Sequence, residues 1–191
     1  FHESKAIAYG KGSSVSQAVA NAAVPVGKTL FLGHLELIAY ENPTFGEQLD
    51  DLMQQYRLSP ACKVACSADG ITLAQEDTTK TVEQLRQAEH AGQLPETDLF
   101  TILREWDTAS GTALVPLMTE DGFSAAIATK TNLSAALSPD AVSGLCWLRG
   151  DNYPEQFSTE SGSYTVSSAK TQLSAEKLPD GFHVTAAIFL E

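Results

Sequence analysis

The 191-residue sequence is poor in basic residues, with 12 Lys and Arg against 24 Asp and Glu and a formal net charge of −12. A chain of this charge repels a phosphate backbone, and no cluster of Lys and Arg with interleaved aromatic residues offsets the repulsion. We therefore expect no nucleic-acid partner. The acidic balance is typical of the solvated surface of a globular protein.

Long hydrophobic runs are also missing. No run of about 18 apolar residues is present, so the sequence predicts no membrane-spanning helix. The opening FHESKAIAYGKGSS has no charged segment followed by an apolar one and does not read as an export signal. Because Phe1 stands where an initiator Met would be, we expect a mature or trimmed product.

Cysteine is scarce, and the three cysteines form an odd count. Cys62 and Cys66 lie in CKVACSAD, which favours a strand, and four residues of strand span about 13 Å. A disulfide needs Cα atoms within about 7 Å, so we expect these two and Cys146 to be free, buried thiols. A zinc site of Cys62, Cys66 and His34 has an unusual spacing and no evident fourth ligand. We therefore expect no metal and no cofactor.

Hydrophobic periodicity predicts alternating helices and strands without a clean βαβ rhythm, and no internal repeat is visible. Ser14 with Gln17 and Thr44 with Glu47 have the spacing of capping boxes, and Ser138 precedes a proline at the first helical position. Gly92 is placed to end a helix, and a hairpin that turns near 130–132 is expected within 123–137. The fold class we predict is α+β, with mixed sheets flanked by helices. Helices are expected within 13–25, 44–56, 78–92, 96–111 and 138–150, and extended segments within 4–12, 29–41, 62–69, 111–118, 123–137, 163–175 and 182–191.

Two units are expected. Residues 1–150 would form an N-terminal α+β domain, and residues 151–191 would form a linker and the start of a second, β-rich domain. The stretch DNYPEQFSTESGS at 151–163 is the most polar and turn-rich in the chain, which favours a linker. The final AAIFLE stops within a strand-like pattern, so we expect more sheet to follow it.

The most unusual local pattern is His34 and Glu36 within the apolar stretch TLFLGHLELIAYE at 29–41. If this stretch is a strand, the two side chains share a face, with Cα atoms roughly 6.6 Å apart. Both faces would be largely apolar, as in an inner strand covered by helices. The interpretation we favour is a polar pair inside a buried sheet, where each side chain satisfies the other.

A catalytic reading of the same pair needs a nucleophile, and the sequence has no GxSxG, HExxH or P-loop motif. GKGSS at 10–14 has glycines before a helix but lacks the spacing of a phosphate-binding loop, and it reads as a turn with a helix cap. We therefore expect no enzyme and no catalytic residues. A hydrolase using His34 and Glu36 stays an alternative.

Three stretches in order carry a resemblance to a known family. They are GKGSSVSQAVANAA running into KTLFLGHLELIAY, then QLDDLMQQYRLSP leading to CKVACSADG, and finally FSAAIATKTNLSAALSPDAVSGLCWLRG. This succession resembles the Ger(x)C family, the C subunits of nutrient germinant receptors in endospore-forming bacteria. The match includes Gly33-His34 in the strand and Leu137-Ser138, Gly144-Leu145 and Trp147-Leu148 around the late helix.

The resemblance implies a function that composition alone does not. These proteins have three α+β domains and no known catalysis, and they act beside an integral-membrane A subunit and a transporter-like B subunit in nutrient-triggered germination. They are typically lipid-anchored and extracytoplasmic, on the outer face of the inner spore membrane. The anchoring cysteine and the C-terminal domain of the family are absent from this sequence, so we expect a truncated or a shorter, divergent relative. ENPTFGEQ at 41–48 departs from the family pattern.

A second alternative is an unrelated extracytoplasmic module that binds a small molecule. A gene neighbourhood that contains the two membrane subunits would separate this alternative from the germination reading.

Overall fold

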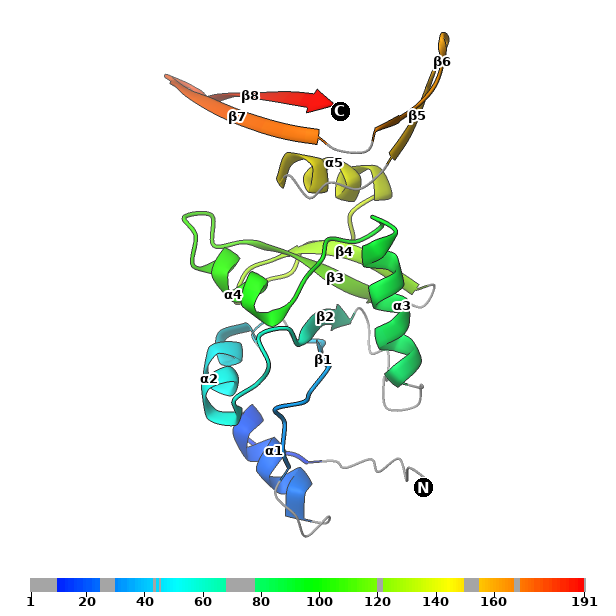
Figure 1. The fold of residues 1–191 in the computed structure, drawn as a ribbon. Coiled ribbons are helices and arrows are strands. Elements are labelled where there is room, and N and C mark those ends of the chain that lie inside the picture. Colours follow the sequence, from blue (N-terminus) through cyan, green and yellow to red (C-terminus); the bar gives the residue numbers. More distant parts are fainter. Residues whose placement is uncertain are drawn as a thin grey trace.

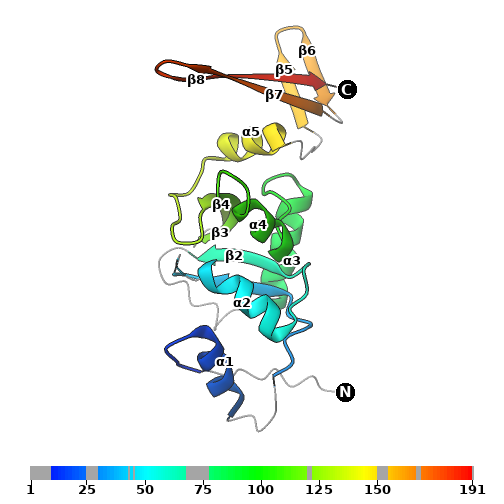
Figure 2. The ribbon, with the colours of Figure 1, turned by 90° about the vertical axis from the view of Figure 1, so that its left-hand side faces the viewer.

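The computed structural model describes residues 10–24, 30–42, 44, 46–67, 78–119, 122–149, 155–166 and 169–190. Its elements follow one another along an elongated molecule, with α1 at one end and the last four strands at the other (Figure 1 and Figure 2). The elements in chain order are α1 (Val15–Ala23), β1 (Leu37–Tyr40), α2 (Gly46–Tyr56), β2 (Lys63–Ser67), α3 (Thr78–His90), α4 (Leu99–Trp106), β3 (Ala113–Thr119), β4 (Gly122–Ala128), α5 (Pro139–Arg149), β5 (Glu155–Thr159), β6 (Gly162–Val166), β7 (Ala169–Leu178) and β8 (Gly181–Leu190).

The central element is a four-stranded mixed sheet in the order β1-β2-β3-β4. The β1 and β2 strands are parallel, with Ile38 opposite Val64, and the β2–β3 pairing is also parallel, through Cys66 and Leu117. The β3 and β4 strands form an antiparallel hairpin. Helix α2 connects β1 to β2, which makes a βαβ unit that the sequence rhythm did not reveal. The predicted α+β class, with a mixed sheet flanked by helices, is confirmed.

Helices cover both faces of this sheet. On one face, side chains of α2 and α4 pack with those of β2 and β3, including Val64 and Val115, in the larger hydrophobic cluster. On the other face, α3 and α5 pack over Leu114 and Ala125. Leu114 and Val115 are successive strand residues and point to opposite faces, and both are buried. The sheet is therefore the middle layer of three.

Several predicted helix ends are confirmed. Ser14 Oγ accepts a hydrogen bond from the Gln17 backbone N–H at 3.2 Å, and Ser138 Oγ accepts from the Ala141 N–H at 3.3 Å. Gly92 follows α3 with φ of 71°, the left-handed conformation that ends many helices. The Thr44–Glu47 capping box is wrong, because Thr44 Oγ1 donates to Asn42 Oδ1 and α2 begins only at Gly46.

The glycines of GKGSS have a packing role. A Cβ at Gly10 or Gly12 would collide with backbone atoms of α1, so the chain can turn back against this helix only without side chains at these positions. Helix α1 is attached to α2 by polar contacts, and Tyr56 Oη donates to the carbonyl oxygen of Ser16 at 3.2 Å. The predicted turn and helix cap at this motif are confirmed.

The chain turns at 130–132 as predicted, but no second strand of a hairpin follows this turn. The antiparallel partner of β4 is β3, and the chain after the turn makes only a single bridge to β4, between Ala128 and Leu133. The Leu137 N–H donates to the carbonyl oxygen of Ala125 at 2.8 Å. This segment therefore borders β4 and leads directly into α5.

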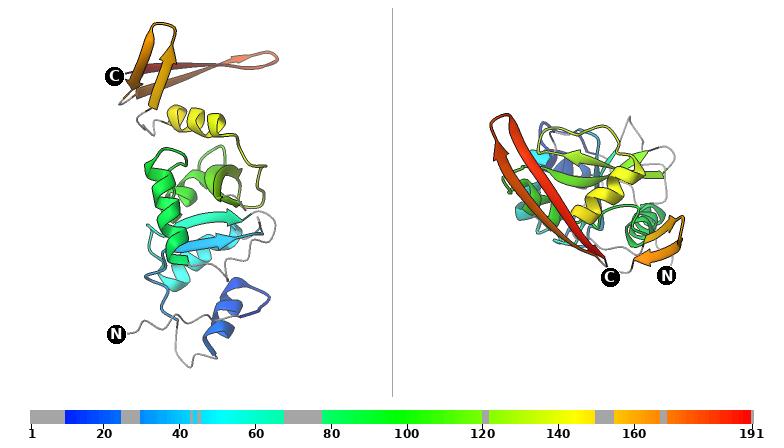
Figure 3. Two further views of the ribbon diagram at one scale, coloured as in Figure 1. Left: turned by 90° about the vertical axis from the view of Figure 1, so that its right-hand side faces the viewer. Right: turned by 90° about the horizontal axis from the view of Figure 1, so that it is seen from above.

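The described part of 151–163, the stretch expected to be a linker, contains strands. Residues Glu155–Thr159 and Gly162–Val166 form an antiparallel hairpin, which turns at a glycine with φ of 146°. A second hairpin, β7–β8, lies on the side of α5 that is away from the four-stranded sheet (Figure 3). A polar stretch can form such a hairpin because its two strands pair through backbone hydrogen bonds. The short strand expected within 4–12 falls largely outside the described residues.

Candidate functional site

The strand predicted at 29–41 is much shorter than expected, and the predicted buried pair is not buried. The β1 strand begins only at Leu37, and Gly33 and His34 lie in a turn closed by a hydrogen bond from the Leu35 N–H to the Leu32 carbonyl oxygen at 3.0 Å. His34 and Glu36 are both exposed. The interpretation of His34 and Glu36 as a polar pair inside a sheet is therefore wrong.

The two side chains also have different neighbours. The His34 ring lies 5.4 Å from the ring of Phe31, which is itself 75% exposed. Glu36 Oε2 lies 3.6 Å from Arg86 Nη2 of α3. In the described contacts, His34 and Glu36 thus have separate partners rather than each other. This arrangement gives no support to hydrolysis by this pair.

The cysteines are free and buried, as predicted. Burial raises the pKa of Cys62 to about 11 and that of Cys66 to about 11, so both thiols are protonated at neutral pH. His34 lies in a turn and is exposed, whereas both thiols are buried. Within the described part of the chain, no group of three His, Cys, Asp or Glu side chains could hold a metal ion.

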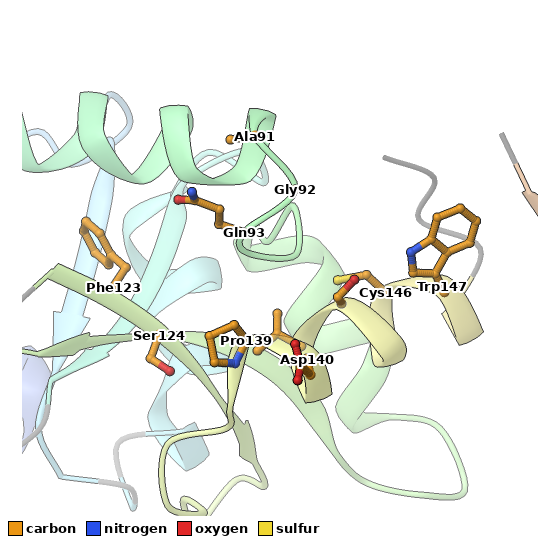
Figure 4. Close-up of a pocket in the computed structure, with 11 residues that line it drawn as sticks. Ala91, Gly92, Gln93, Phe123, Ser124, Pro139, Asp140, Cys146 and Trp147 are labelled. Atoms are coloured by element: carbon orange, nitrogen blue, oxygen red, sulfur yellow. The ribbon is translucent and has the colours of Figure 1, made fainter. Parts of the chain in front are cut away.

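A cavity of about 450 Å³ lies between the end of α3, the start of β4 and helix α5 (Figure 4). Its apolar wall includes Phe123, Val142 and Trp147, and its polar groups include Gln93 and Asp140. The described residues that line it are Ala91, Gly92, Gln93, Phe123, Ser124, Pro139, Asp140, Val142, Ser143, Cys146 and Trp147. This mixture of apolar walls and a few polar groups is typical of sites for small molecules.

Local sequence determines how α5 borders the cavity. Pro139 occupies the first helical position, where its missing N–H costs nothing, and Ser138 satisfies the N–H groups of Ala141 and Val142. Ser124 Oγ donates to the Leu137 carbonyl oxygen at 3.1 Å, which fixes the approach of the chain to β4. The start of α5 is therefore firmly attached to the sheet.

The other end of α5 contacts the C-terminal hairpins. Trp147 packs against Val166 of β6, and its carbonyl oxygen accepts a hydrogen bond from Thr171 Oγ1 of β7 at 2.5 Å. Arg149 forms an ion pair with Glu105 of α4. Trp147 thus borders the cavity and also holds the hairpins against the helix.

The sequence did not reveal this cavity. Its residues come from three separate segments, and their approach depends on how α5 lies across the sheet. The one local signal is Gly92, which was correctly predicted to end α3 and which also lines the cavity.

Comparison with known proteins first identifies a similar fold. The fold is similar to that of a solved structure, the crystal structure of the GerBC protein, with a TM-score of 0.54 and 13% sequence identity. The similarity covers 88% of this chain and 58% of that chain, so this chain spans little more than half of the solved relative. A search of curated protein sequences finds no match.

The family follows from the sequence match. Residues 2–120 match the family described as the spore germination protein N-terminal domain. The chain therefore belongs to this family of spore germination proteins, the Ger(x)C family. None of the helices in its described part is both long and apolar enough to cross a membrane.

Proposed function

We propose that this protein is a non-catalytic subunit of a spore germinant receptor and contributes to nutrient-triggered germination. The family match over residues 2–120 carries the proposal. The fold shared with GerBC supports it, because the shared part extends beyond the matched domain to 88% of this chain. The exposed and separate positions of His34 and Glu36 fit a role without chemistry at that pair.

We further propose that the protein acts outside the cytoplasm, on the outer face of the inner spore membrane, and is held there by a lipid anchor on the native protein. Its partners would be the integral-membrane A and B subunits of the receptor. A lipid anchor attaches a protein to a membrane without a spanning helix. The family resemblance supports both proposals.

The domain division is part of the same proposal. Residues 1–150 would form the first unit, which contains the sheet and its four covering helices, and residues 151–191 would begin a second, β-rich unit. The β7–β8 hairpin supports this division because one of its faces is apolar and still exposed. Leu173, Val184 and Phe182 lie on that face and are 54%, 61% and 70% exposed.

The test is a deletion of the gene in the spore-forming source, followed by complementation. Deletion should slow germination in response to at least one nutrient, and the wild-type gene should restore it. Germination by an agent that bypasses the receptors should be unaffected. The membrane fraction of the complemented spores should yield the A and B subunits when this protein is pulled down. Normal responses of the deletion spores to all nutrients would contradict the proposal.

The alternative of a small-molecule binding module is favoured by one specific observation, the cavity beside α5. Binding there is compatible with the receptor role and can be measured without it.

A further inference from the structure

We propose that the cavity between α3, β4 and α5 binds a small molecule that has an ammonium group and an apolar body. The volume of about 450 Å³ lies within the usual range of roughly 300–1,000 Å³ for ligand pockets. The proposal goes beyond the role in germination, and binding at this site can be measured on the isolated chain.

The charge preference follows from Asp140. Among the described residues that line the cavity, Asp140 is the single carboxylate, and none of them is a Lys, Arg or His. Among the described residues, no hydrogen bond or ion pair engages the Asp140 side chain, which is exposed at the start of α5. A carboxylate with no cation beside it leaves an ammonium group as the best partner for this position.

An anionic ligand is disfavoured by the same helix end. Helix N-termini bind anions through unsatisfied N–H groups, but here Pro139 has none. The N–H groups of Ala141 and Val142 donate to Ser138 Oγ and to the Ser138 carbonyl oxygen. Asp140 itself offsets the positive end of the helix dipole, and the chain as a whole has a charge of −12.

The apolar walls account for the second part of the ligand. Phe123 of β4 and Val142 of α5 both line the cavity. In Figure 4, Phe123 and Trp147, which comes from the far end of α5, lie on opposite sides. Trp147 is 8% exposed, and it also packs against Val166. A bound molecule would therefore contact the side chain that links α5 to the C-terminal hairpins.

The binding test uses three probes of one shape. Phenethylamine has an ammonium group, 2-phenylethanol is neutral, and 3-phenylpropionate is an anion. Each is titrated into the ¹⁵N-labelled full chain, and the shifts of the Gly92 and Ser143 amides and of the Trp147 indole N–H are followed. The indole signal is assigned with Trp147→Phe. We expect saturable shifts with the amine, binding of the alcohol about three- to fivefold weaker, and binding of the anion weaker still.

The matched variants are Asp140→Asn and Asp180→Asn. Both aspartates are exposed, but Asp180 lies in the β7–β8 turn, away from the cavity. Asp140→Asn should lower the affinity for the amine to that for the alcohol, and Asp180→Asn should leave it unchanged. The spectrum of each variant checks its fold. The proposal is overturned if the amine gives no saturable shift at the cavity, if the three probes bind equally, or if Asp140→Asn binds the amine as tightly as the wild type.

Discussion

The four-stranded sheet and the β7–β8 hairpin both have apolar strand faces, but these faces are buried in the sheet and exposed in the hairpin. In β3, Leu114 and Val115 point to opposite faces, and both are buried because helices cover each face. In the hairpin, Val184 and Phe182 share a face with Leu173 and stay exposed. The comparison shows that apolar strand residues are buried only where another element covers their face of the sheet.

The hairpin face is covered at only one end. Thr171 lies on the apolar face and donates to the Trp147 carbonyl oxygen, so this end rests on α5. The opposite face is more polar, and on it Ser174 pairs with Thr185 and Glu176 with His183. The hairpin is thus amphipathic, and its stability depends less on packing than that of the sheet does.

The largest expected effect on stability comes from a buried ion pair in the first unit. Lys63 Nζ lies 2.7 Å from Glu89 Oε2, and the side chains are 12% and 6% exposed. Glu89 Oε1 also accepts from the Thr97 N–H at 3.1 Å. Lys63→Met leaves a buried carboxylate without its cation and should lower the free energy of unfolding by about 3–5 kcal/mol in urea melts.

The control is the double variant Lys63→Met with Glu89→Leu, which should recover part of that loss because no buried charge then remains. A single variant as stable as the wild type would show that this pair is not needed to join α3 to β2.

A matched pair of valines sharpens the comparison directly. Val115 is 0% exposed in β3, whereas Val184 is 61% exposed in β8. Val115→Thr buries a hydroxyl and should lower the free energy of unfolding by about 1–3 kcal/mol. Val184→Thr should change it by less than about 0.5 kcal/mol. Equal losses in thermal or urea melts would mean that the hairpin is covered in solution.

The buried thiols predict that the free energy of unfolding of the first unit depends on pH. Folding raises the pKa of Cys62 and Cys66 from an ordinary value of 9.0 to about 11. The folded state therefore holds the protons more tightly, so this contribution is fully present below pH 9 and is lost as the pH rises towards 11. The free energy of unfolding should fall by on the order of 1–3 kcal/mol per thiol across that window. The decline should be smaller in Cys66→Ala, and an identical decline in that variant would exclude the thiol as its source.

The smallest effect on stability is expected at the turn of Gly33 and His34 and at the neighbouring Glu36. Glu36 and Arg86 form an ion pair with side chains 64% and 58% exposed. Glu36→Gln should change the free energy of unfolding by less than about 0.5 kcal/mol, because exposed pairs contribute little. His34→Leu should be similarly mild. A loss of 1 kcal/mol or more in urea melts would restore the buried interpretation of this pair.

Local features were predictable from the sequence because they depend on neighbouring residues. Ser14, Ser138 and Gly92 were correctly predicted as helix ends, and the β2 strand was recognised from its own composition. These signals act over a few residues and need no knowledge of the rest of the fold.

The remaining features depend on distant segments. The apolar residues from Phe31 to Leu35 looked like a strand, but Gly33 turns the chain, and Phe31 finds no covering layer among the described residues. Parallel pairing of β1 with β2 requires a register that no local pattern specifies. The cavity likewise exists only because α5 crosses the sheet near Gly92.

The most direct test of the division into two units is amide hydrogen exchange, measured residue by residue on the full chain. We expect amides of the β3–β4 hairpin and of α4 to exchange only through global unfolding. Amides of β7 and β8 should exchange faster through local opening, and residues near Phe182 should exchange faster than those near Thr171. Equal protection of β8 and β3, lost together at one urea concentration, would contradict the division and show a single cooperative unit.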